Sequence, residues 1–421
     1  MTPLPPEGPA DAVALSAPSE TLAGLRELLD LVARQNPFYR QKWAGLALPE
    51  SLAAFVRDYP FTHKPELVAD QNASPPYGTN QTYPVTDFVR LHQTSGTSGK
   101  PLRWLDTPES WANLREDWAE VFLQAGLTTG DRVLFAFSFG PFLGFWLAFE
   151  AAQGLGALCI AGGGMSSALR LRVLLENQCT VLCCTPTYAL HLAEEARKEG
   201  VDLKASKVRL LVVAGEPGGS IPSVRERLSE AWNNARIFDH HGMTEVGPVT
   251  FEHPQLPGNL VVVERSFLAE VVDTATGRQL GPGERGELVL TTLRRAGMPL
   301  VRYRTGDIVC ARREESSGWL LLEGGILGRV DDMVVVRGVN VYPAAIDEIV
   351  RALCGTAEYR VNLDTRTPLT ELSIEVEAEA GVAAALESQL RQVLSLRIPV
   401  SSVEVGVLPR YEMKARRWRR L

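Results

Sequence analysis

Short apolar runs alternate with amphipathic stretches between residues 131 and 216 of the 421-residue chain. The apolar runs are DRVLFAFSF, ALCIAGG, TVLCCTP and VRLLVVAGE. The stretches between them, such as GFWLAFEAAQGLG and LRLRVLLENQ, have the spacing of helices with one apolar face. Strand–helix alternation of this kind predicts a largely parallel sheet covered by helices, and the expected fold class is therefore α/β.

The sequence pattern in the rest of the chain differs between three regions. Residues 1–20 are rich in Pro and Ala and predict a flexible tail, and a helical region broken by Pro37 and Pro60 follows up to about Arg57. After Glu252, shorter strands separated by turn residues predict a β-rich subdomain at about 252–327. From Gly328, strand and helix patterns predict a small α+β domain, with MVVVRGVNV as one strand. The expected domains are a tail (1–20), a large N-terminal domain (21–328) and a C-terminal lid domain (329–421).

Composition excludes several classes of protein. A net charge of −7 gives no general attraction to nucleic acid or to an anionic membrane. The N-terminus lacks the pattern of a secretory signal, and no apolar run approaches the roughly 20 residues that cross a bilayer. The six cysteines lack metal-type spacing and are interpreted as reduced core thiols. A cytoplasmic protein is expected.

One segment concentrates hydroxyls, glycines and a lysine: Thr94-Ser95-Gly96-Thr97-Ser98-Gly99-Lys100-Pro101. Phosphate oxygens require many donors at close range, glycines let backbone N–H groups approach, and a lysine adds charge. The segment does not match the G-x-x-x-x-G-K-[ST] pattern, and Pro101 obstructs a helix directly after the lysine, so a Walker-type ATPase is disfavoured. A flexible Ser/Gly linker is the structural alternative.

Four later motifs follow in order: Gly215-Glu216-Pro217, Asp239-His240-His241-Gly242-Met243-Thr244-Glu245, Tyr303-Arg304-Thr305-Gly306-Asp307 and Gly328-Arg329-Val330-Asp331-Asp332. With the segment 94–100, this set resembles the motifs of the adenylate-forming superfamily of acyl-CoA synthetases, adenylation domains and luciferases. The continuation VRGVNVYP and the short C-terminal part are similar to the phenylacetate-CoA ligase branch. The resemblance covers nearly the whole chain from about residue 25.

The resemblance implies a nucleotide site. Glu245 supplies the hard carboxylate that a phosphate-bound Mg²⁺ takes from a protein, and Asp307 accepts from both ribose hydroxyls. Arg329 resembles the arginine that contacts the ribose, and Thr244 is placed to donate to the α-phosphate. Each of these residues, taken alone, could equally be a surface or turn residue. The full nucleotide set is Thr94, Ser95, Gly96, Thr97, Ser98, Gly99, Lys100, Gly215, Glu216, Pro217, Asp239, His240, Gly242, Thr244, Asp307 and Arg329.

The end LPRYEMKARRWRRL resembles a P-R-x-x-x-K ending and implies that Lys414 is a mobile catalytic lysine. A cation at the α-phosphate stabilises the charge that develops during adenylation. A basic tail is the alternative, because KARRWRRL carries five positive charges. The implied catalytic set is Lys414, Thr244, Glu245 and His241. The implied hinge and coenzyme A segment comprises Asp331, Arg337, Gly338, Val339 and Asn340.

The acyl pocket implied by the resemblance contains the aromatic side chains after DRVLFA. Flat apolar surface of this kind suits an aryl or arylacetic acid, although the same rings could form plain core. Two adjacent histidines on an extended chain point to opposite sides, so His240 and His241 are interpreted as walls of the nucleotide and acyl pockets rather than as a metal site. The expected acyl pocket is Phe137, Phe139, Phe142, Trp146, Gly215 and His241.

The predicted function is ATP-dependent activation of a carboxylic acid to an acyl-AMP, followed by thioester formation with coenzyme A. The expected cofactors are ATP, Mg and coenzyme A, and the expected partner is a small-molecule acid. Three alternatives stay open: an adenylation enzyme that serves a carrier protein or an amine, a non-catalytic ligand-binding homologue, and a P-loop motor or kinase that would release ADP. A homodimer is also left open by the sequence.

Overall fold

In the computed structural model, two compact units divide the chain, and each is described by itself. The first unit contains Met1–Gly164 and Phe238–Ile326, and the second contains Met165–Ile237 and Leu327–Leu421. The predicted domain boundaries at 20 and 328 are a different division and stay a prediction. The residues that the structure describes are Ala12, 17–94, 101–330, 332, 334–336, 339–355, 357–364, 366, 371–394, 396–411 and 417–421.

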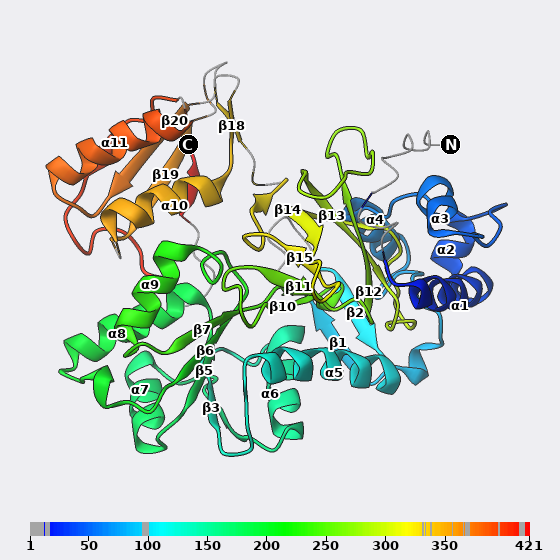
Figure 1. Ribbon diagram of the computed structural model, residues 1–421, viewed down its shortest axis with the longest axis horizontal. Helices are drawn as coiled ribbons and strands as arrows, with labels where there is room; N and C mark the ends of the chain where they lie inside the picture. The colour runs from blue at the N-terminus through cyan, green and yellow to red at the C-terminus, as the bar shows by residue number, and fades with distance from the viewer. Residues whose placement is uncertain are drawn as a thin grey trace. The chain divides into compact units, whose positions relative to one another are not determined.

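Four helices begin the first unit (Figure 1): α1 (Ser19–Gln35), α2 (Pro37–Lys42), α3 (Leu52–Asp58) and α4 (Lys64–Ala73). The break predicted at Pro37 is confirmed, because α1 ends at Gln35 and the Asn36 side chain caps α2 by accepting from Tyr39 N at 3.2 Å. Leu25, Leu29 and Phe55 are buried in one cluster that also contains residues of the β-rich region, including Val301. The helices therefore share a core with the strands.

An antiparallel sheet forms the β-rich part of the first unit. Its strands, in the order β10-β11-β15-β14-β13-β12, are β10 (Thr250–Glu252), β11 (Leu260–Val262), β15 (Leu320–Leu322), β14 (Tyr303–Arg313), β13 (Arg285–Thr292) and β12 (Phe267–Val272). The residues DTATG (273–277) form a turn between β12 and β13, where Asp273 Oδ1 accepts from Thr276 N at 2.8 Å and Gly277 has a φ of 71°. The sheet thus follows the predicted short strands and turns.

The first unit also contains α5 (Pro108–Gln124), α6 (Leu143–Gly154) and three strand pairs. Strands β1 (Arg90–Gln93) and β2 (Arg103–Asp106) form an antiparallel hairpin, and β8 (Gly242–Met243) pairs with β9 (Gly247–Pro248). Strands β3 (Arg132–Phe135) and β4 (Leu158–Ala161) are parallel, with α6 as the crossover between them. This pairing confirms the strand–helix–strand prediction.

In the second unit, β5 (Val181–Cys184) and β6 (Leu210–Val213) are parallel and fully buried. Helices α7 (Ser167–Glu176), α8 (Pro186–Lys198) and α9 (Pro222–Ala231) flank them in sequence, and the unit boundary after Ile237 falls within β7 (Arg236–Asp239). All six cysteines are free, and Cys183 and Cys184 lie buried on β5 as predicted.

The C-terminal part of the second unit is a four-stranded sheet in the order β21-β20-β19-β22, with α10 (Pro343–Cys354) and α11 (Ala380–Leu394) (Figure 1). The strands are β19 (Tyr359–Asp364), β20 (Glu371–Val376), β21 (Val400–Ser402) and β22 (Trp418–Arg420). Prediction of one strand over MVVVRGVNV was wrong, because β17 (Val334–Val336) and β18 (Val339–Val341) pair antiparallel as two strands.

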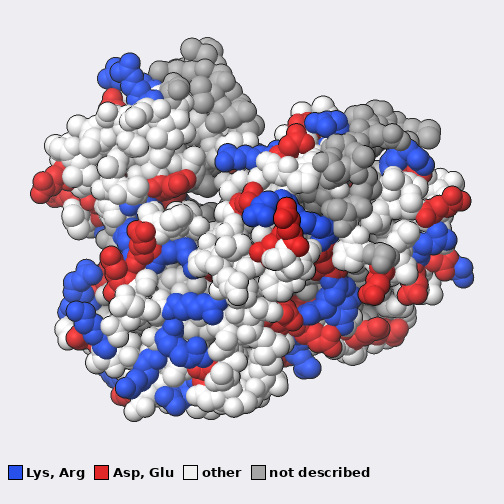
Figure 2. Space-filling model, viewed as in Figure 1, with Lys and Arg blue, Asp and Glu red and all other residues white. Residues whose placement is uncertain are grey.

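Charged residues of both signs are interspersed over the face shown in Figure 2. None of the helices in the described ranges has both the length and the apolar composition needed to cross a bilayer.

Arg302 forms a buried ion pair that joins helices and sheet in the first unit. Its guanidinium bonds to Glu270 on β12 at 2.7 Å and donates to the backbone carbonyls of Val56 and Tyr59. Arg302 and Glu270 are each no more than 1% exposed at the side chain, and Arg302 has a φ of 49°. One side chain thus connects α3, the chain after it and the sheet.

We expect Arg302→Met to lower the free energy of unfolding by about 3 to 5 kcal/mol, because Glu270 would stay buried without its cation. Urea denaturation of the full chain, followed by circular dichroism, measures this change. The matched control is Arg34→Met, whose partner Asp30 lies on an exposed helix face, and it should cost less than about 0.5 kcal/mol. A loss at Arg302 as small as that of the control would contradict this account.

Candidate functional site

Hydrogen bonds and one close backbone contact hold the segment 239–245 of the first unit. Glu252 on β10 accepts from Asp239 N at 2.5 Å, and Asp239 accepts from His240 N at 2.9 Å. Gly242 is required by packing, because a Cβ there would lie 2.8 Å from the carbonyl oxygen of Gly247. The segment is therefore fixed at both its start and its centre.

The two adjacent histidines have different neighbours. The His240 ring is buried, lies 4.3 Å from the Trp118 ring between centroids, and places Nδ1 3.2 Å from Thr250 O. Burial lowers the pKa of His240 to about 3, so the ring is neutral at physiological pH. His241 instead places Nε2 3.2 Å from Oδ2 of Asp307. The predicted alternation of the two side chains agrees with these contacts.

Asp307 lies on β14 and is 2% exposed. Its backbone N–H donates to Thr305 Oγ1 at 3.0 Å, and Thr305 in turn donates to Leu288 O on β13 at 2.7 Å. These two hydrogen bonds within the sheet fix the backbone at Asp307 and so determine where its carboxylate lies. The structure thus places the Asp307 carboxylate next to His241, although the two residues are far apart in the sequence. The motifs 239–245 and 303–307 can share one site only if they meet in this way.

Glu245 carries a buried carboxylate that is paired with a lysine which the sequence motifs did not include. Lys64 Nζ lies 3.0 Å from Glu245 Oε1, and the side chains are 44% and 7% exposed, respectively. Lys64 is the first residue of α4, where a positive charge is unfavourable next to the helix dipole. That unfavourable placement was the one local signal that Lys64 has a partner elsewhere.

The Glu245 carboxylate fits a role in holding Mg²⁺. Among the described residues, no three His, Cys, Asp or Glu side chains are grouped as a metal site. One buried carboxylate is nevertheless sufficient, because Mg²⁺ is commonly held by one or two carboxylates together with phosphate oxygens of the substrate. Mg²⁺ would then take the place of Lys64 as the cation at Glu245.

The predicted phosphate segment connects the strands of a hairpin. Thr94 N donates to Leu102 O at 3.0 Å, and Leu102 N donates to Thr94 Oγ1 at 3.1 Å, so the β1–β2 ladder continues to this pair. A strand rather than a helix follows Pro101, as expected if the segment is not of the Walker type. Ser95–Lys100 themselves lie outside the described residues.

The four predicted acyl-pocket aromatics gather at the loop after β3 and the start of α6. Phe137 stacks on Phe145 at 4.2 Å between centroids with a 20° interplanar angle, and Phe142 contacts the same ring edge-on at 5.8 Å. Phe139 contacts Trp146 at 5.1 Å. Phe145 was missed by sequence reasoning, and it joins Phe137 to Phe142, while Phe137 also contacts Phe139 at 5.6 Å. All five rings are partly exposed.

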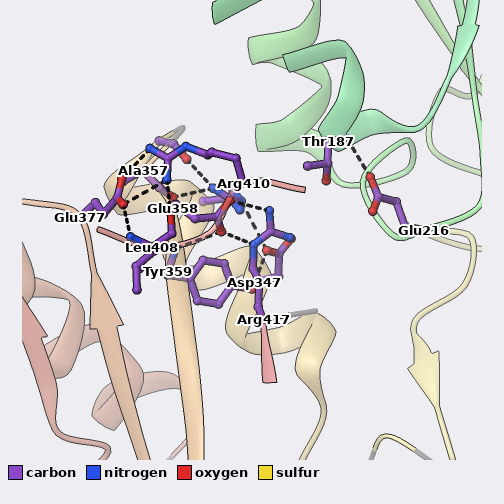
Figure 3. Close-up of polar contacts among 12 residues, drawn as sticks. Thr187, Glu216, Asp347, Ala357, Glu358, Tyr359, Glu377, Leu408, Arg410 and Arg417 are labelled. Carbon is purple, nitrogen blue, oxygen red and sulfur yellow. Dashed lines mark hydrogen bonds and ion pairs between the residues drawn. The ribbon is translucent and has the colours of Figure 1, made fainter. Parts of the chain in front are cut away.

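In the second unit, the predicted residues Gly215, Glu216 and Pro217 follow β6. Glu216 Oε1 accepts from Thr187 N in the first turn of α8 at 2.7 Å (Figure 3). This contact satisfies one of the N–H groups that a helix leaves without an internal partner. Glu216 therefore has a structural role, whereas Gly215 and Pro217 are exposed on the turn. Arg329, half-buried on β16 (Gly328–Arg329), also belongs to this unit.

The predicted lysine Lys414 lies outside the described residues, as do Asp331, Arg337 and Gly338, whereas Val339 and Asn340 lie on β18. The chain on both sides of 412–416 is anchored by ion pairs (Figure 3). Arg410 pairs with Glu377 at 2.6 Å, and Arg417 pairs with Glu358 at 2.5 Å. Glu358 directly precedes β19 and Glu377 directly follows β20, and the two residues are neighbours at this end of the sheet, because Glu377 N donates to Glu358 O at 2.9 Å.

Comparison with known proteins shows matches along most of the chain. Residues 50–293 match the family model of the AMP-binding enzyme, and residues 338–419 match that of the AMP-binding enzyme C-terminal domain. Phenylacetate-coenzyme A ligase of Pseudomonas putida is 31% identical over 90% of this chain and 88% of its own length. The Escherichia coli (strain K12) phenylacetate-coenzyme A ligase is 29% identical over 90% and 89%.

A solved structure is also similar. The crystal structure of 2-hydroxyisobutyryl-CoA ligase in the postadenylation state, in complex with R3-HIB-AMP, has a TM-score of 0.89 and 28% sequence identity. The match covers 97% of this chain and 91% of the ligase chain. The predicted fold class is confirmed by this similarity.

His240 predicts a pH dependence of stability. Its pKa is about 3 in the folded chain against 6.5 ordinarily, so below pH 6.5 the unfolded chain binds the proton more readily and stability falls with falling pH. From pH 7 to pH 5, we expect His240 to account for a loss of roughly 2 kcal/mol. His240→Gln should remove that part of the dependence, measured as unfolding free energy at both pH values. Above pH 7.5, the unfolding free energies of the variant and the wild type should change with pH in parallel. Equal pH dependence of the two proteins between pH 7 and pH 5 would contradict this role of His240.

Proposed function

The chain belongs to the AMP-binding enzymes, and from this premise we propose that it is a ligase that activates a carboxylic acid with ATP and transfers the acyl group to coenzyme A. The observation that carries the proposal is the placement of Asp307 against the segment 239–245, which also holds the buried Glu245 carboxylate. These are the residues that a ribose and a phosphate-bound cation require. The proposed cellular location is the cytoplasm.

In the first step, a carboxylate oxygen of the acid attacks the α-phosphorus of ATP, and the bond to pyrophosphate breaks. The proposed phosphate segment 94–100 holds the triphosphate, Asp307 accepts from the ribose hydroxyls, and Thr244 donates to the α-phosphate. Lys414 stabilises the charge that builds up at this phosphate. Magnesium, when bound at Glu245, neutralises phosphate charge.

His240 and Glu252 support this step from beneath the segment. The His240 ring packs on Trp118 and contacts Thr250 O, and Glu252 fixes the backbone at Asp239. Gly215 and His241 line the nucleotide and acyl sides in this proposal.

In the second step, the thiol sulfur attacks the acyl carbon, and AMP leaves with the electrons of the acyl–oxygen bond. The proposed C-terminal domain 329–421 turns about Asp331 between the two steps. The segment Arg337–Asn340 then borders the thiol. A carrier protein or an amine would enter at this step if it replaced coenzyme A.

The proposed acid is aromatic, because five partly exposed rings, Phe145 among them, contact one another in one cluster. The ring-to-ring contacts in this cluster are those that an aryl or arylacetic acid could extend. Two relatives of the chain are phenylacetate-coenzyme A ligases, which supports an arylacetic acid.

A screen of aromatic and aliphatic acids, with and without coenzyme A, tests the proposed function. We expect acid-dependent release of AMP, with turnover that requires coenzyme A. Chromatography of the nucleotides measures this release. Adenylation without thioester formation would favour a carrier protein or an amine as acceptor. ADP as product, or no nucleotide turnover with any acid, would refute the proposal.

We expect Lys414→Ala to reduce acid-dependent pyrophosphate exchange by at least about 10²-fold, because the variant loses the cation at the α-phosphate. ATP binding, measured by calorimetry, should change little. The control is Lys198→Ala, which removes an exposed lysine paired with Glu195 on α8 and should leave exchange unchanged. Full exchange in Lys414→Ala would refute the role of this lysine.

Phe137→Leu tests the aromatic cluster. Loss of one ring-to-ring contact of about 0.5 to 1.5 kcal/mol should raise the KM for an arylacetic acid roughly 2- to 10-fold. The KM for ATP is the internal control and should not change, because it reports on the nucleotide side of the site. An equal rise in both values would indicate a general distortion instead of a role in the acyl pocket.

A further inference from the structure

Arg295 is almost completely buried in the first unit and is bound on one side by Asp106. Its Nε and Nη2 atoms donate to the two carboxylate oxygens of Asp106, each at 2.7 Å. The side chains are 2% and 0% exposed, respectively. This bidentate geometry fixes the plane of the guanidinium as well as its position.

On its other side, Arg295 binds the backbone of the proposed site. Its Nη1 atom donates to the carbonyl oxygens of Thr244 and Glu245, both at 2.9 Å. With the two bonds to Asp106, four of the five guanidinium donors are used. Carbonyl positions define the peptide planes, so these bonds constrain the directions in which the Thr244 hydroxyl and the Glu245 carboxylate leave the chain.

Asp106 connects this arginine to a second part of the proposed site. It is the last residue of β2, the strand that begins shortly after the segment 94–100, and its carbonyl accepts from Val89 N at 2.9 Å. Burial by itself would raise the pKa of Asp106, but the charge and hydrogen bonds of Arg295, together with His92, outweigh burial, and the pKa lies below its ordinary value. Asp106 is therefore an anion that holds Arg295 against a fixed strand.

Stability alone does not account for this arrangement. The attraction within a buried ion pair offsets little more than the free energy lost by desolvating the two charges. Apolar side chains of similar volume often stabilise a fold equally well. An apolar replacement could not hold two carbonyl groups in place. A lysine could not do so either while it also bonds to Asp106 in a bidentate manner, because its ammonium lacks the planar fork.

We propose that Arg295, oriented by Asp106, is a positioning residue that couples strand β2 to the Thr244–Glu245 backbone and aims the Glu245 carboxylate at the metal-bound phosphate. The proposal rests on the proposed function, since it concerns the same site. Arg295 does not touch the nucleotide; it acts through the two residues whose carbonyls it binds.

The test uses Arg295→Met and Arg295→Lys in the full chain, with acid-dependent pyrophosphate exchange measured over a range of Mg²⁺ concentrations. For both variants we expect the Mg²⁺ concentration at half-maximal rate to rise about 10- to 100-fold, the usual effect of losing a residue that orients a metal ligand. The KM for the acid should stay within about 2-fold, because the acyl side keeps its contacts. Arg295→Lys should recover part of the thermal stability but not the Mg²⁺ dependence.

Arg302→Met is the matched control, because Arg302 is equally buried and also pairs with a carboxylate but binds the carbonyls of Val56 and Tyr59. Below its unfolding temperature, it should show the wild-type Mg²⁺ dependence. If Arg295→Met and Arg302→Met lose rate alike and neither shifts the Mg²⁺ dependence, Arg295 is only structural and the positioning role is overturned. If the wild type itself shows no exchange with any acid, the proposed function fails, and the positioning role fails with it.

Discussion

A buried guanidinium needs a carboxylate and several further acceptors, and the first unit meets this requirement at both Arg302 and Arg295. Arg302 uses its remaining donors on carbonyls at the end of α3, so it joins the helical N-terminal region to β12. Arg295 uses them on the segment that carries Glu245. The same hydrogen-bonding requirement thus builds the fold at one arginine and connects two parts of the proposed site at the other.

Local patterns were sufficient to predict several elements of both units. The alternation of apolar runs and amphipathic stretches predicted the parallel pairs β3–β4 and β5–β6, and Pro37 predicted the end of α1. The run MVVVRGVNV was different, because a continuous apolar pattern does not show where a strand reverses. Gly338 was the available sign of a turn, whereas Asn340 lies on β18 and pairs with Val335.

Partners far apart in the sequence could not be predicted in this way. Lys64 and Glu245 are separated by 181 positions, and no periodicity connects them. Phe145 was hidden for another reason: it lies on α6, where an aromatic residue is expected to face the core. Glu216 was assigned to the nucleotide by its motif, yet its carboxylate binds Thr187 N in α8. The site residues named from the motifs stay predictions, whereas hydrogen bonds and ion pairs between distant residues become visible only in the tertiary structure.

Two cations act on the loop that carries Glu245, and they differ in how easily they can leave. Lys64 is 44% exposed at the side chain, so water could replace the carboxylate around its ammonium at small cost if Mg²⁺ bound Glu245 as we propose. Arg295 is 2% exposed, and its departure would leave Asp106 buried without a counter-charge. The side-chain partner of Glu245 is therefore exchangeable, whereas the partner of its backbone is permanent. In the proposed metal–nucleotide site, this combination would let the Glu245 carboxylate change partners while the Arg295 bonds hold its backbone in position.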